Sequence, residues 1–118
     1  MGEGVENWKT ITLYPTYEVS DMGRVRNKQT QRVLSPIRRN RELCVYLKNY
    51  TLNRFEWRRV SALVLREFKP QGRKLGHVYH INKDYDDNRA SNLKWIYGRE
   101  FHIRARLTKN QFHQISKP

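Results

Sequence analysis

The hydrophobic period of the chain changes near Arg59, and this change restricts the fold more than any other feature of the sequence. Residues 41–50, RELCVYLKNY, alternate in a way that is typical of a central β-strand buried on both faces. Residues 60–68 instead place apolar side chains at positions i, i+3, i+4 and i+8. That is the pattern of an amphipathic helix ending before Pro70. Together the two patterns predict an α+β fold.

Shorter segments complete the expected architecture, a small mixed β-sheet module with one helix. Further strands are expected at residues 8–14, on both sides of a turn at Gly23, and at 31–37, 54–60, 77–82 and 93–97. A helix is predicted over residues 99–106, and a short one begins at Thr108 as a plausible N-cap. The loop that follows Pro70 is the expected boundary. It divides the chain into a basic module at 1–70, a finger at 71–107 and a C-terminal helix at 108–118.

The charge of the chain predicts its class of partner. Lys and Arg number 24 against 11 Asp and Glu, which gives a net charge of +13. Such an excess on one small domain is typical of proteins that bind DNA or RNA, because phosphates attract clustered basic side chains. The alternative is an interaction domain that meets an acidic protein. The residues expected to include the main phosphate contacts are Arg24, Arg26, Arg38, Arg39, Arg41, Arg58 and Arg59.

Membrane insertion, secretion and disulfide formation are not expected. The sequence has no run of 18 apolar residues, and its first residues, MGEGVENWKTI, lack the apolar core of a signal peptide. Its one cysteine, Cys44, permits neither an internal disulfide nor a zinc cluster built from cysteines. We therefore expect an intracellular protein.

Residues 76–95, GHVYHINKDYDDNRASNLKW, gather polar groups that could act on a phosphodiester. His80 could take a proton from water at physiological pH, because the imidazole pKa lies near neutrality. Asn92 could hydrogen-bond the loop backbone and hold that His in place. The loop residues between them are more typical of turn and capping groups than of Mg²⁺ ligands. These turn residues are Asp84, Asp86, Asp87 and Asn88.

The segment HINKDYDDNRASNLKW resembles the HNH (His-Me-finger) nuclease motif of phage-type homing endonucleases. The upstream stretches WKTITLYPTYEVSDMGRVRN, VLSP and RRVSALVLREF are similar to the DNA-binding module that precedes this motif in many members. The resemblance runs from about Trp8 to about Arg106. It implies a ββα finger, endonuclease activity with Mg²⁺ or Mn²⁺, His80 as the general base and Asn92 as the middle Asn of the motif. It also places Arg24 and Arg26 in a GRVR segment.

The chain departs from the family pattern at Lys83, where the resemblance implies Gly, and at Ser61, where it implies His. It also departs at the two positions that hold the metal. The residue before the general base is Tyr79, where the resemblance implies Asp, Asn or His. Nine residues after Asn92 the family has Asn or His, and here stands Phe101. Neutral Tyr is a poor Mg²⁺ ligand, and Phe has no donor atom. The remaining candidates are Asp84 and His102; for His102 to serve, its side chain would have to rotate by about 100° on the helix.

Three functional hypotheses follow from these residues. In the first, the chain is a former homing endonuclease that binds DNA or RNA with impaired or lost catalysis. In the second, it is an active divalent-metal-dependent DNA endonuclease with His80 as its base. In the third, it is a structural RNA-binding component of a ribonucleoprotein, where protein partners are also expected.

Overall fold

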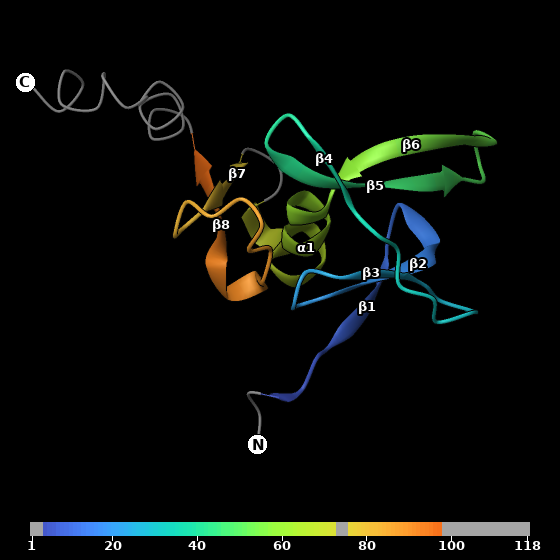
Figure 1. Ribbon diagram of the computed structural model, residues 1–118, viewed down its shortest axis with the longest axis horizontal. Coiled ribbons are helices and arrows are strands. Elements are labelled where there is room, and N and C mark those ends of the chain that lie inside the picture. The colour runs from blue at the N-terminus through green and yellow to red at the C-terminus, as the bar shows by residue number, and fades with distance from the viewer. Residues whose placement is uncertain (1–3, 73–75, 98–118) are drawn as a thin grey trace, which may run out of the picture.

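The computed structural model describes residues 4–72 and 76–97, which form three small sheets around one α-helix (Figure 1). The strands are β1 (Trp8–Ile11), β2 (Tyr14–Ser20), β3 (Val25–Asn27), β4 (Ile37–Arg39), β5 (Glu42–Asn49), β6 (Arg54–Arg59), β7 (Gly76–His80) and β8 (Leu93–Tyr97). The helices are α1 (Val60–Phe68) and two 3-10 turns, η2 (Pro70–Gly72) and η3 (Ala90–Asn92). The α+β class is confirmed. The described strands differ from the expected mixed sheet, because every pairing among them is antiparallel.

The first sheet has the order β1-β2-β3 and contains the expected strand, turn and strand around Gly23. The strand expected to run from residue 8 to 14 instead ends at Ile11, because a tight turn follows. Thr12 in that turn donates its backbone N–H to the Glu67 carboxylate of α1 at 2.8 Å. Tyr14, opposite Ile11, then begins β2. The helix therefore fixes the corner of this sheet.

The second sheet has the order β4-β5-β6, so β5 is central as predicted. The prediction that β5 is buried on both faces is wrong: Val45 is buried, whereas Tyr46 on the other face is 51% exposed. Cys44 shares that face and is 5% exposed, so the face is covered at Cys44 and open at Tyr46. The strand expected at 31–37 is also wrong, because β4 begins only after Pro36 and Val33 makes a single bridge. Proline lacks the N–H that a continuous ladder requires.

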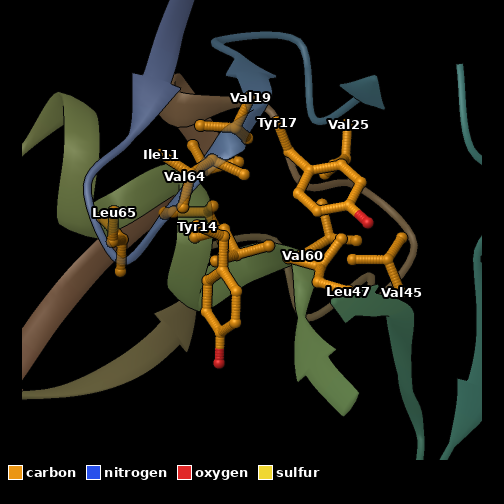
Figure 2. Close-up of a cluster of buried hydrophobic side chains, with 12 residues drawn as sticks. Ile11, Tyr14, Tyr17, Val19, Val25, Val45, Leu47, Val60, Val64 and Leu65 are labelled. Carbon is orange, nitrogen blue, oxygen red and sulfur yellow. The ribbon is translucent and has the colours of Figure 1, made fainter. Parts of the chain in front are cut away.

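The core lies where α1 packs against the sheets, and Figure 2 shows its side chains converging from β2, β5 and the helix. Its buried members include Val19, Leu47, Val64 and Leu65. Leu93 of β8 belongs to the same cluster, so the β7–β8 hairpin shares this core. The boundary predicted at residue 70 stays a prediction. The helices predicted at 99–106 and 108–118 lie outside the described residues.

A polar cluster joins the first two sheets beside this core. Tyr14 donates its hydroxyl to the Glu56 carboxylate at 2.5 Å, and Arg54 Nε donates to the same carboxylate at 2.9 Å. Between them, Tyr14 first and then Arg54, they lower the pKa of Glu56 from 4.5 to about 2.

The helices of the described residues are all too short or too polar to span a lipid bilayer.

Glu56 should make the stability of the protein sensitive to acid. Its folded-state pKa is lowered, so its contribution is present above about pH 4.5 and is lost as the pH falls through about 2. We expect the melting temperature of the wild type to fall more steeply across that range than that of Glu56→Gln. Thermal melts at stepped pH measure both slopes. Equal slopes would contradict the role given to the Glu56 cluster.

Candidate active site and nucleic-acid interface

The β7–β8 hairpin carries the polar segment and is tied to the end of α1. His80 ends β7 and lies opposite Leu93, the first residue of β8. Lys69, just after α1, donates Nζ to the Leu93 carbonyl at 2.7 Å, and Trp95 donates Nε1 to the Lys69 carbonyl at 2.6 Å. The helix thus holds the hairpin in a fixed place, and the loop of residues 81–89 projects from it.

His80 is buried, with 3% of its surface exposed, and it is oriented by Asn88. Its Nε2 lies 2.7 Å from Asn88 Oδ1. Because an amide oxygen can only accept, this bond places the proton on Nε2 and leaves the Nδ1 lone pair available. The Tyr85 ring meets the imidazole edge to face, with 5.1 Å between ring centroids. The arrangement suits a base that takes a proton at Nδ1.

Asn88 is the residue that the sequence analysis missed. We expected it to be a turn residue, whereas it is 4% exposed and holds the His80 ring. A buried amide must be hydrogen-bonded, but the sequence alone does not show that Asn88 is buried. The two residues are separated by an irregular loop, where neither a helical nor a strand period applies, so no sequence pattern connects them.

Asn92 makes the hydrogen bonds expected of a loop brace. Its Oδ1 accepts from the Asn82 backbone N–H at 3.0 Å, and its Nδ2 donates to the Asp87 carbonyl at 2.8 Å. The same Nδ2 lies 2.9 Å from Asn82 Oδ1. One buried side chain therefore closes the loop from both ends. Its assignment as a catalytic residue stays a prediction.

Removing this brace should destabilise the hairpin. Asn92→Ala leaves the Asn82 N–H and the Asp87 carbonyl without their partner, and we expect a loss of about 1–3 kcal/mol in unfolding free energy. Urea denaturation measures it. Ser91→Ala, at the exposed neighbouring position, is the matched control and should change little. Equal stabilities of the two variants would show that Asn92 does not brace the loop.

The loop carboxylates are already engaged within the loop or with Arg side chains. Asp84 Oδ1 accepts from the Asp86 N–H at 3.0 Å, which is a turn bond. Arg89 donates to both oxygens of Asp87, at 2.8 and 2.7 Å, and lowers the pKa of Asp87 to about 2. Asp86 pairs with Arg38 at 2.5 Å. Among residues 4–72 and 76–97, no group of three His, Cys, Asp or Glu side chains could hold a metal ion.

Tyr79 and Phe101 occupy the two expected metal-ligand positions, and the structure describes only Tyr79. Lys94 Nζ lies 5.7 Å from the centre of the Tyr79 ring, across the β7–β8 pair. Phe101 and His102 lie outside the described residues. Of the two expected ligand positions, the described finger therefore contains only Tyr79, and a neutral Tyr is a poor Mg²⁺ ligand. Asp84 is a turn residue in this geometry.

Two further departures from the family pattern also have structural consequences. Lys83, where the resemblance expects Gly, adopts a φ of 65°. This left-handed conformation costs a residue with a side chain about 1–2 kcal/mol. Ser61, where the resemblance expects His, is fully buried and donates its hydroxyl to Glu42 at 2.6 Å.

Most of the seven arginines expected to contact phosphate are paired within the chain. The ion pairs are Arg24–Glu6 at 2.6 Å, Arg26–Glu18 at 2.8 Å, Arg38–Asp86 at 2.5 Å, Arg58–Glu56 at 3.1 Å and Arg59–Glu42 at 3.1 Å. Of the seven candidates, Arg39 and Arg41 are the two that have no ion pair with a described residue. Both lie at the turn of the β4–β5 hairpin, which Arg38 joins to the finger loop. This turn is the most available cationic part of the expected interface.

Aromatic side chains cover the outer face of the second sheet. The Tyr46 ring centroid lies 5.1 Å from that of Phe55 and 4.6 Å from that of Trp57. Phe55 is 51% exposed, so it lies on the surface of the sheet and not in the core. The Arg39 guanidinium lies 4.4 Å from the Trp57 ring centre. Cationic and aromatic groups therefore share one exposed surface, as in many nucleic-acid interfaces.

Comparison with known proteins agrees with this arrangement. The family model for the NUMOD4 motif matches residues 6–48, which span the first sheet and most of β5. The fold is that of a solved structure described as "DNA binding and cleavage by the HNH homing endonuclease I-HmuI". That match has a TM-score of 0.71 and 23% identity, and it covers 93% of this chain and 66% of that one. The motif, the finger and the fold together support an HNH homing-endonuclease-like protein.

Two curated relatives support the same class. Both are described as uncharacterized HNH endonucleases of Acanthamoeba polyphaga mimivirus. One is 36% identical over 97 residues and the other 34% identical over 92 residues. Each match covers 77% of this chain but only 24% or 27% of the relative. The chain thus spans about a quarter of the length of these proteins.

Proposed function

We propose that the chain binds DNA through its basic face, and that the substitutions at positions 79 and 101 impair metal-dependent cleavage by its HNH-like finger. One observation carries the proposal. The finger keeps an oriented His80, whereas the carboxylates of its loop are engaged by turn N–H groups and arginines. Proton transfer is supported by this geometry, and tight holding of a divalent metal is not.

The binding half of the proposal is supported by charge and by adjacency. The chain has a net charge of +13, and the hydrogen bond from Arg38 to Asp86 brings the β4–β5 turn beside the finger loop. This contact places the turn that carries Arg39 and Arg41 near the finger loop. The similarity to I-HmuI, whose structure is described as showing DNA binding and cleavage, favours DNA as the polyanion.

An active endonuclease is the second candidate function. The observation that favours it is the intact set of bonds around His80, with Asn88 on its Nε2 and Asn92 closing the loop. In such an enzyme His80 Nδ1 would take the proton from the attacking water. No described contact distinguishes RNA from DNA, and the test below separates them.

Fluorescence anisotropy with a labelled DNA duplex tests the proposed binding. We expect saturable binding at low ionic strength, with RNA duplex of the same sequence as a weaker competitor. His80→Ala should leave the DNA affinity unchanged, because His80 is buried and is assigned to proton transfer. Absence of DNA binding would overturn the proposed function, and stronger competition by RNA would replace DNA by RNA as its ligand.

A further inference from the structure

The turn between β2 and β3 packs directly against the residue that orients His80. The backbone N–H of Ala90 donates to the Asp21 carbonyl of this turn at 2.8 Å. At Gly23, a Cβ atom would lie 2.9 Å from both Asn88 Cβ and the Asn88 carbonyl oxygen. Real Cβ atoms do not make contacts this short, so only glycine leaves Asn88 in its place.

We propose that the β2–β3 turn positions the imidazole of His80 through Asn88, with Gly23 as a positioning residue. The chain of contacts is short: Gly23 packs on Asn88, and Asn88 Oδ1 holds His80 Nε2 at 2.7 Å. Asn88 is nearly fully buried, so displacement of its backbone moves its amide oxygen as well. The effect of this positioning on catalysis rests on the proposed role of His80. The contacts themselves are independent of that role.

The turn is itself held rigidly, which it must be to position another residue. Ser20 Oγ accepts from the backbone N–H groups of Met22 and Arg24, each at 3.1 Å. Asp21 accepts from the Asn7 backbone N–H at 3.0 Å and from the Asn7 side-chain amide at 2.8 Å. These bonds fix both sides of Gly23, so Asn88 and not the turn would have to move to make room for a side chain.

The β2–β3 hairpin connects two of the expected phosphate contacts with the finger that carries His80. Arg24 follows Gly23 directly, and Arg26 lies on β3; both are expected phosphate contacts. The element that would meet the DNA backbone is therefore the one that packs behind the His80 acceptor. A shift of this hairpin would reach the imidazole through a single intervening residue.

Substitutions at Gly23 need a design that separates contact from backbone strain. Gly23 has a φ of +86°, which Ala tolerates poorly and Asn tolerates better. Gly23→Asn therefore keeps the added Cβ while lowering the strain, and it provides a second variant if Gly23→Ala does not fold. Gly4→Ala is the matched control, because nothing lies within 4 Å of a Cβ at that position.

The test is ¹⁵N NMR of the His80 side chain in the full chain labelled at histidine. The wild type should show a slowly exchanging Nε2–H proton, because that proton is buried and bonded to Asn88. Loss of one such hydrogen bond is worth about 1 kcal/mol, so Gly23→Asn should speed this exchange roughly fivefold. Asn88→Ala should do the same, Asn88→Asp should retain the slow signal through its remaining acceptor, and Gly4→Ala should match the wild type.

Unchanged Nε2–H exchange in folded Gly23→Asn would overturn the inference, and so would absence of a slow signal in the wild type. Both readouts are independent of cleavage. If the wild type fails to bind DNA while the exchange behaves as expected, the proposed function is lost and the positioning by Gly23 stands.

Discussion

Restoring donor atoms at the two altered positions should convert the chain into an efficient nuclease. We expect the double substitution Tyr79→Asp and Phe101→Asn to raise the rate of Mg²⁺-dependent plasmid nicking by at least about a hundredfold. A bound metal supplies several kcal/mol of transition-state stabilisation, and each 1.36 kcal/mol is a factor of ten in rate. Quantified gels of supercoiled plasmid under single-turnover conditions measure the effect.

The controls for this gain separate metal binding from changes in packing. Tyr79→Phe with Phe101→Leu changes both side chains without adding a metal donor, and it should show no gain. Adding His80→Ala to the restored variant should return its rate to that of the wild type, because the proton acceptor at Nδ1 is lost. A restored variant that folds and binds DNA but nicks no faster than the wild type would show that these positions do not limit cleavage.

The DNA affinity of the wild type should fall by roughly a thousandfold between 50 and 200 mM salt. A protein that neutralises about six or more phosphates releases that many counterions, and its affinity drops by about 10³ or more over this range. The net charge of +13 and the seven candidate arginines supply enough cations for such an interface. Anisotropy titrations at stepped salt give the slope of log affinity against log salt.

Single substitutions should change the salt slope more at an arginine that has no internal ion pair than at one that has such a pair. Arg41→Gln should lower the magnitude of the salt slope by about one, because Arg41 has no ion pair in the described part of the chain. Arg26→Gln should lower it less, because Glu18 at 2.8 Å already neutralises Arg26 in the free protein. A shallow wild-type slope, or equal effects of the two variants, would contradict this description of the interface.

The helix and the main hairpin of the fold could be predicted from local pattern alone. The apolar period of α1 and the alternation along β5 both reflect burial against a single core. Alternation could not show that Tyr46 faces solvent, because the sequence pattern of a strand is the same whether an apolar face is covered by another element or not. The strand expected at 31–37 differs from β4 because proline cannot donate to a continuous ladder, so the strand begins only after Pro36.

The site residues could be predicted only where their separation along the chain matches a known motif. His80 and Asn92 could be singled out because the resemblance fixes their separation, and the loop bonds of Asn92 agree with that assignment. Asn88 and Gly23 meet through tertiary contact between distant segments, which no local period records. The ion pairs that occupy Arg24 and most other candidate arginines are likewise products of the fold.

The central claim is that this chain holds DNA through its basic face while its altered finger cleaves poorly. The most direct measurement incubates the wild type with supercoiled plasmid at low ionic strength in Mg²⁺ and follows retention and nicking in the same samples. We expect a retarded plasmid that stays supercoiled until the protein is removed. Rapid nicking that His80→Ala abolishes would contradict the impaired finger, and a plasmid that migrates freely would contradict DNA binding itself.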